Sequence, residues 1–150
     1  MTRLRWVYAS LLVLLLVLIG GHEFNQKAEQ NSQTLVLNMK NSCEAGDVES
    51  CTRLGAKYLV GTDVNQDVTK AITLLLNACN GGHAFACGGL GALYFLGEDV
   101  EQDIEKAVDF LNRACDGKFA KSCSVLGKLY STGDGLEQAN DKAAVLFKQA

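Results

Sequence analysis

The chain has 150 residues, of which 48% are hydrophobic, with 15 glycines and no proline. This composition favours helices, whose interiors exclude proline and whose ends use glycine, and the length is enough for one domain with a sizeable core. The formal net charge is −3 and the sequence has no run of basic residues, which excludes a nucleic-acid partner and disfavours acidic substrates.

The first 21 residues have the pattern of an export signal. Arg3 and Arg5 precede an apolar run from Trp6 to Gly21, which lies between a signal-peptide core and the roughly 20 residues that span a bilayer. We therefore expect residues 1–21 to be either a signal peptide, cut at the glycine pair that ends the run, or an uncleaved signal anchor. Because the arginines stay on the cytoplasmic side, the rest of the chain is predicted to be periplasmic or secreted, or tethered to the inner membrane through residues 6–21.

A polar stretch separates this signal from the rest of the sequence. Residues 22–32 have few apolar side chains and no periodicity, so we predict a linker. The next segment, QTLVLNMKNSC at residues 33–43, aligns with TKAITLLLNAC at residues 69–79. It predicts a lone helix that begins a repeat domain over residues 33–150.

Three units of 36 residues make up most of this domain. They span residues 43–78, 79–114 and 115–150, and they align without a gap. All three share two cysteines, Leu-Gly, Tyr, Gly, Gln and Lys-Ala at the same columns. Such a period is typical of solenoids, in which each unit buries its apolar face against its neighbours.

Each unit contains two helical patterns, helix A and then helix B. Helix A carries Cys, Leu, Gly and Tyr at i, i+3, i+4 and i+7, and its glycine predicts the close approach of a neighbouring helix. Helix B carries alanine and larger apolar residues at the same spacing. Asp67 and Asp103 are suited to cap the first turn of helix B, whereas the third unit has Ala139 in that column.

The cysteines of an exported chain predict disulfides. Joining the two cysteines of each unit links the end of one helix B to the start of the next helix A, and joining the second cysteine of one unit to the first of the next is also geometrically plausible. Only the first scheme uses every thiol, so we predict that one. The pairs are Cys43 with Cys51, Cys79 with Cys87, and Cys115 with Cys123. Zinc is disfavoured because it needs Cys-x-x-Cys or histidine partners, and redox catalysis because it needs Cys-x-x-Cys, so no metal and no cofactor are expected.

The combined pattern of Cys-x7-Cys, Leu-Gly-x-x-Tyr, Gly, Asp-x-x-Lys-Ala and Ala-Cys resembles the Sel-one-like repeat, a relative of the tetratricopeptide repeat. Within that family, the cysteine pairs resemble the Helicobacter cysteine-rich proteins. The resemblance covers residues 33–150 and implies an all-α solenoid, a right-handed superhelix of helical hairpins with one disulfide per repeat. It also implies an adaptor for other proteins or for envelope components such as peptidoglycan.

Some members of the cysteine-rich branch are described as penicillin-binding or weakly β-lactamase-like, which makes a hydrolase the alternative function. The sequence has no Ser-x-x-Lys, Ser-x-Asn or Lys-Thr-Gly to supply an activated serine, and we identify no catalytic residue. His83 is the only histidine of the repeat domain, and we expect it to be a solvated surface residue.

A protein or peptide partner is predicted to bind the face formed by helices A. Its non-core positions would form an apolar centre flanked by basic residues, unless the apolar ones pack on an adjacent repeat. These candidates are Arg53, Lys57, Phe85, Leu93, Leu96, Lys121 and Lys128.

Overall fold

The structure is a computed structural model that describes residues 26–150. The chain divides into a unit that ends at Asn38 and a second unit, Met39–Ala150. The predicted signal, residues 1–21, lies outside the described residues. Residues 26–44 form one continuous helix, so part of the segment expected as a linker is helical and runs into the predicted lone helix. Among residues 26–150, no helix combines the length and apolar character needed to cross a bilayer.

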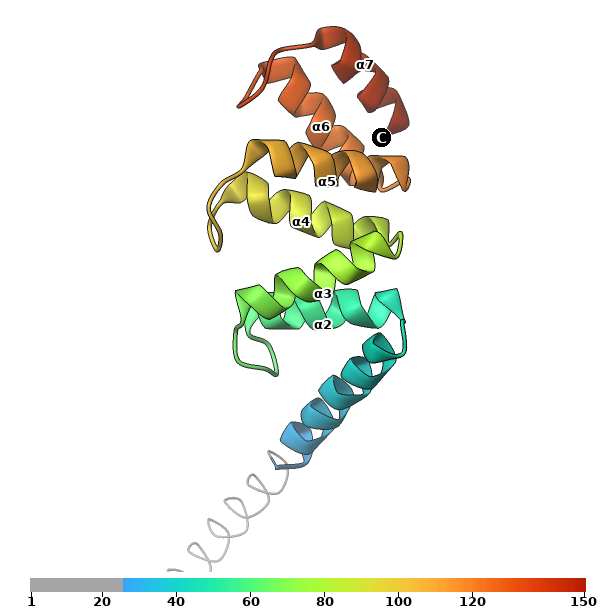
Figure 1. The fold of residues 1–150 in the computed structure, drawn as a ribbon, viewed down its shortest axis with the longest axis vertical. Helices are drawn as coiled ribbons and strands as arrows, with labels where there is room; N and C mark the ends of the chain where they lie inside the picture. Colours follow the sequence, from blue (N-terminus) through green and yellow to red (C-terminus); the bar gives the residue numbers. More distant parts are fainter. Residues whose placement is uncertain (1–25) are drawn as a thin grey trace, which may run out of the picture. The chain divides into compact units, whose positions relative to one another are not determined.

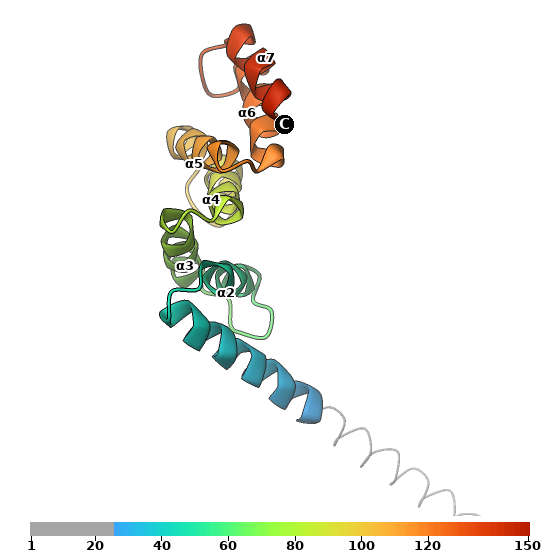
Figure 2. The same ribbon diagram turned by 90° about the vertical axis from the view of Figure 1, so that its right-hand side faces the viewer.

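The second unit is a stack of helical hairpins (Figure 1). Helices A of the three repeats are α2 (Val48–Val60), α4 (Ala84–Leu96) and α6 (Ala120–Thr132), and helices B are α3 (Val68–Asn80), α5 (Ile104–Asp116) and α7 (Asn140–Gln149). Figure 2 shows α3 and α5 on one side of the stack and α2 and α4 on the other. The predicted all-α solenoid of 36-residue hairpins is confirmed.

Each helix A ends in the same way. Gly61, Gly97 and Gly133 adopt φ values of 77°, 67° and 71°, the left-handed conformation that glycine adopts without steric cost. The glutamine that recurs five residues later then donates a side-chain hydrogen bond to a carbonyl near the end of the helix. One such bond joins Gln102 Nε2 to the Phe95 carbonyl over 2.7 Å. The invariant glycine and glutamine therefore stabilise one turn together.

Helix B begins in the same column in every repeat. Asp67 and Asp103 accept hydrogen bonds from the backbone N–H groups of Lys70 and Lys106, over 2.9 and 3.0 Å. These bonds lower the pKa of both carboxyl groups; for Asp103 the side chain of Lys106 is the largest cause. In the third repeat Ala139 supplies no cap, yet α7 starts in the same column.

Within each hairpin the two helices approach closely at the helix A glycine. A Cβ atom on Gly91 would lie 2.7 Å from Leu111 Cγ, and one on Gly55 would lie 3.0 Å from Leu75 Cγ. In the third repeat the neighbour of Gly127 is the ring of Phe147. The close approach predicted from these glycines is confirmed.

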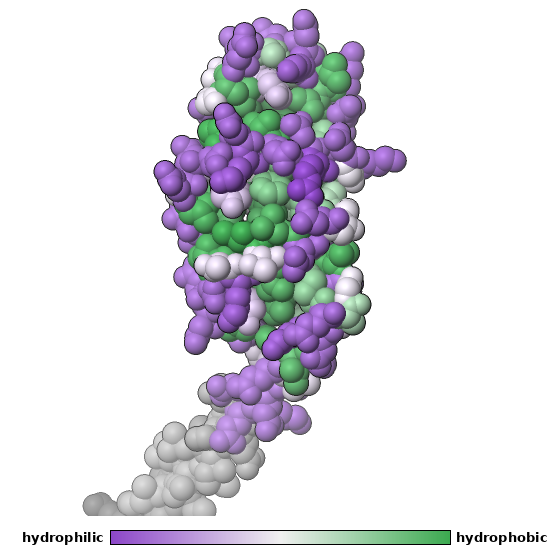
Figure 3. All heavy atoms as spheres, viewed as in Figure 1, coloured by the Kyte–Doolittle hydropathy of each residue, from purple (hydrophilic) through white to green (hydrophobic). Residues whose placement is uncertain are grey.

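The core lies where hairpins meet, and the disulfides are part of it. The bonds join Cys43 to Cys51, Cys79 to Cys87 and Cys115 to Cys123, with Cα–Cα distances of 4.6, 4.8 and 4.8 Å. One buried cluster contains Cys79 and Cys87 with side chains of α3, α4 and α5, and another contains Cys115 and Cys123 with side chains of α5 and α6. On the face seen in Figure 3, hydrophobic atoms are concentrated around α3 and α4.

Candidate partner-binding groove

An apolar groove of about 310 Å³ lies between the helices A of the second and third repeats. Its position depends on the close approach of α4 and α6. A Cβ atom on Gly88 would lie 2.8 Å from the ring of Phe119 and 2.9 Å from Ser122 Oγ, so glycine is needed for this contact. The groove is lined by Phe85, Gly88, Gly89, Ala92, Phe95, Leu96, Leu111, Phe119, Lys121, Ser122 and Val125.

Two aromatic residues form one wall of the groove. The rings of Phe85 and Phe119 meet edge to face, with centroids 5.4 Å apart and planes at 72°. This arrangement places the positive ring edge against the negative face. Phe85 is nevertheless 57% exposed, so the pair leaves apolar surface available to a ligand.

Three of the residues predicted from the sequence line this groove: Phe85, Leu96 and Lys121. Leu96 is 59% exposed, and Lys121 is also exposed. Lys128 lies in the adjoining hollow, which shares Phe95 and Val125 with the groove and also contains Asp134.

The expectation that Leu93 is a surface position was wrong. Leu93 is only 7% exposed and belongs to the core. Its column holds Lys57 in the first repeat, which made the position look polar, and Leu129 in the third, which is also buried. A side chain covered in this way is not available to a partner.

Arg53 and Lys57 do not line the groove. Arg53 Nε lies 3.5 Å from a carboxylate oxygen of Glu49, one helical turn away, and Lys57 pairs with Asp63. The predicted basic flank in the first repeat is therefore matched by acidic partners.

The junction between α2 and α4 is built differently from the one between α4 and α6. His83, the residue before α4, places Nδ1 2.8 Å from Thr52 Oγ1 and Nε2 3.0 Å from Glu49. Thr52 Oγ1 also lies 2.7 Å from the Val48 carbonyl, so the same hydroxyl contacts both the His83 ring and the backbone of α2. Through these contacts His83 bridges the start of α4 and α2. Its side chain is 24% exposed, so it is more buried than we expected of a surface histidine.

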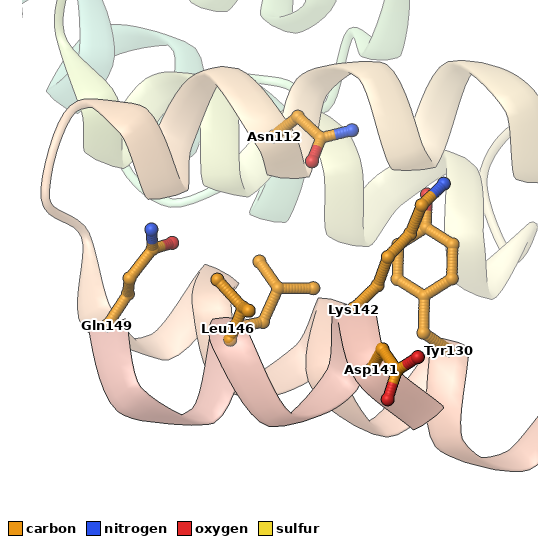
Figure 4. A pocket seen from close by; sticks show the side chains of 7 residues that line it. Asn112, Tyr130, Asp141, Lys142, Leu146 and Gln149 are labelled. Carbon is orange, nitrogen blue, oxygen red and sulfur yellow. The ribbon is translucent and has the colours of Figure 1, made fainter. Parts of the chain in front are cut away.

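A second pocket lies between α5 and α7 (Figure 4). Asn112 reaches toward it from α5, Gln149 lies at one end, and Tyr130 and Lys142 lie together at the other. Lys142 Nζ is 5.2 Å from the ring centre of Tyr130, and the same lysine–tyrosine contact recurs at 5.3 and 5.2 Å in the first and second repeats. We assign this contact to the repeat framework.

Within residues 26–150, no group of three or more His, Cys, Asp or Glu side chains is placed to hold a metal ion.

The residues that line the groove but were not identified from the sequence include Gly88, Gly89, Phe95, Phe119 and Val125. Phe119 had the clearest signal, because its column holds Asp47 and His83 in the other repeats and a large aromatic residue there departs from a polar pattern. The two adjacent glycines inside α4 were a second signal, since glycine destabilises a helix interior.

A family model described as the Sel1 repeat matches residues 48–83, 84–119 and 120–150. These windows have the same period as the units above and begin at helix A. No curated protein sequence matches the chain.

Several solved structures resemble the chain. A protective antigen of uropathogenic Escherichia coli with an SLR fold has 26% sequence identity and a TM-score of 0.72 over 76% of the chain, which spans only 24% of that antigen. A Sel1 repeat protein of Oxalobacter formigenes has 28% identity and a TM-score of 0.69, over 75% of this chain and 85% of that one. Helicobacter pylori cysteine rich protein B has 21% identity and a TM-score of 0.62, over 81% and 86% of the two chains, and shows the shared fold.

Proposed function

The chain belongs to the Sel1 repeat family, and from this premise we propose that it is an exported, disulfide-stapled scaffold that binds a partner protein in the groove between α4 and α6. The observation that carries the proposal is the groove itself. Large exposed apolar side chains, Phe85 and Leu96, line a hollow with a single charged residue at its edge. An exposed apolar hollow of this kind is typical of interaction sites.

Site-specific photocrosslinking tests the binding site. A photoreactive phenylalanine analogue placed at Leu96 in the full-length protein, expressed in its own cells, should form a protein adduct that mass spectrometry identifies. The matched control is the same analogue at Val60, which is 73% exposed at the end of α2 and lies outside the groove. Equal adducts from both positions, or none from Leu96, would contradict the proposal. An adduct with peptidoglycan fragments would indicate an envelope component as the partner.

Export is supported by the basic start and apolar run of residues 1–21 and by the three disulfides, because such bonds persist in oxidising compartments. We propose a periplasmic or secreted protein, with residues 6–21 either removed or kept as an anchor. Alkylation of intact cells followed by mass mapping should leave all six cysteines unalkylated, because they are held in disulfides, and the N-terminal peptide should show whether the signal is cut. Free thiols throughout would overturn this part of the proposal.

The alternative function, a weak β-lactamase-like hydrolase, is untested. Nitrocefin turnover by the purified protein tests it, and we expect turnover at background level.

A further inference from the structure

We infer that the groove between α4 and α6 selects a peptide that places an apolar side chain over Gly89 and a carboxylate beside Lys121. This inference rests on the proposed function, and it names the chemistry of the partner at the same site. Gly89 and Lys121 both line this groove, and each is an unfavourable residue at its position in its own helix. Contacts within the chain explain neither of them.

Gly89 is the first of these residues. It lies inside α4, where glycine destabilises a helix relative to alanine. Packing explains the other two glycines of α4, because a Cβ atom on Gly88 would meet Phe119 and one on Gly91 would meet Leu111. A Cβ atom on Gly89 would meet nothing within 4 Å. The space above Gly89 is therefore open to a group that the chain itself does not supply.

Lys121 is the second. It lies in the first turn of α6, where the helix dipole disfavours a cation, and the residue before the helix, Phe119, gives no side-chain cap. The same column holds Glu49 in the first repeat, the favourable sign for that position. Among residues 26–150, no carboxylate forms an ion pair with Lys121. Its charge and the uncapped N–H groups of α6 both favour an incoming carboxylate.

The local charge of the groove opposes the net charge of the chain. The formal charge of −3 does not attract acidic partners from a distance, but no acidic residue lines the groove and Lys121 is its single charged lining residue. One carboxylate next to one apolar side chain matches this lining. Lys128 is not counted, because it shares the next hollow with Asp134.

The test uses the full-length protein and a fluorescein-labelled hexapeptide with a central aspartate–phenylalanine pair, followed by fluorescence anisotropy. Replacing the peptide's phenylalanine by alanine, or its aspartate by lysine, should weaken binding about tenfold. Gly89→Leu fills the open space, so it should weaken binding about tenfold while the Tm of the protein rises, since leucine favours helix more than glycine does. Lys121→Glu should weaken binding about fivefold, and added salt should reduce that difference.

Matched controls lie on α7. Ala144→Leu introduces the same side chain and Lys148→Glu makes the same charge change at exposed positions outside the groove, and both should leave binding within about twofold. The inference is overturned if no peptide of the set binds, if the lysine peptide binds as well as the aspartate peptide, or if Gly89→Leu and Lys121→Glu bind like the unchanged protein. Displacement of the peptide by decanoate at equal concentration would also overturn it, in favour of a fatty anion.

The crosslinking experiment separates failure of this inference from failure of the proposed function. If Leu96 captures a partner and Gly89→Leu leaves that capture unchanged, the groove binds a protein of other chemistry. If Leu96 captures nothing, the proposed function fails.

Discussion

The junction between α2 and α4 and the junction between α4 and α6 join equivalent helices of successive repeats. Their side-chain contacts differ, because the first junction is polar and the second is apolar. At one column, His83 joins α4 to α2 through Thr52 and Glu49, whereas Phe119 packs α6 onto α4 through Gly88 and Phe85. The first junction is bridged by polar groups, and the second opens into an apolar groove. The repeated columns therefore build the framework, and the columns that vary between repeats decide what surface each junction presents.

The central disulfide is the change with the largest expected effect on this comparison, because it lies at the start of α4, the helix that both junctions share. Replacing Cys79 and Cys87 together by serine should lower the free energy of unfolding by about 2–3 kcal/mol, the loop-entropy value for a ring of this size. Urea denaturation measures the loss. Replacing Cys115 and Cys123 instead should loosen the second junction and spare the first, so hydrogen exchange in α2 should rise only in the first variant.

Replacing a residue of the α4–α6 junction by its counterpart from the α2–α4 junction should also lower the stability of the protein. Gly88→Thr introduces the residue that the first repeat has in this column, Thr52, but the added Cβ would lie 2.8 Å from the Phe119 ring. We expect a loss of about 1–3 kcal/mol from overpacking, together with a distorted groove. Thermal unfolding measures the loss, and Gly89→Thr, where nothing lies within 4 Å, is the control that should not show it. Equal losses in both variants would mean that Phe119 does not limit the approach of α4 and α6.

The converse exchange, His83→Phe, tests the polar junction. It removes the hydrogen bond to Thr52, whose side chain is buried, and the contact with Glu49, so we expect a loss of about 1 kcal/mol. A double-mutant cycle with Thr52→Val measures how much of the loss belongs to that pair. A coupling energy indistinguishable from zero would show that the bridge does not stabilise the junction.

The smallest effects are expected at the helix B caps, which touch neither junction. Ala139→Asp gives α7 the cap that α3 and α5 have, and it should stabilise the protein by about 0.5–1 kcal/mol without changing peptide binding.

Because the pKa values of Asp67 and Asp103 are lowered in the folded state, the contribution of these two caps to stability is present above the unfolded pKa, near 3.8, and is lost as the pH falls through the folded pKa values. Tm measured from pH 6 down to pH 2 should therefore fall more steeply for the unchanged protein than for Asp67→Asn/Asp103→Asn.

Much of the framework was predictable because it repeats. The period, the alternation of helices A and B, the close approach at Gly55, Gly91 and Gly127 and the capping role of Asp103 all follow from residues that recur at fixed spacing. The invariant glutamine was visible in the sequence, but its hydrogen bond to the end of helix A was not, because a loop must fold back before the two groups meet.

The groove was only partly predictable. Phe85, Leu96 and Lys121 were identified as surface positions of helix A, but Leu93 was placed with them although it is buried. One helix's periodicity indicates which residues share a face, and it does not state how far the next repeat covers that face. Phe119 was missed because it precedes its helix, outside the helical positions from which the surface candidates were chosen.

The sequence by itself determined the repeat and its helices, because these depend on local spacing, and it favoured the cysteine pairing that uses every thiol. Only the tertiary structure decided that the second junction leaves an open space over Gly89 and that Phe119 forms a wall beside it. The physical reason is that a groove is the volume that two helices leave unfilled. That volume depends on their distance and orientation, which are set by side chains from residues far apart in the chain.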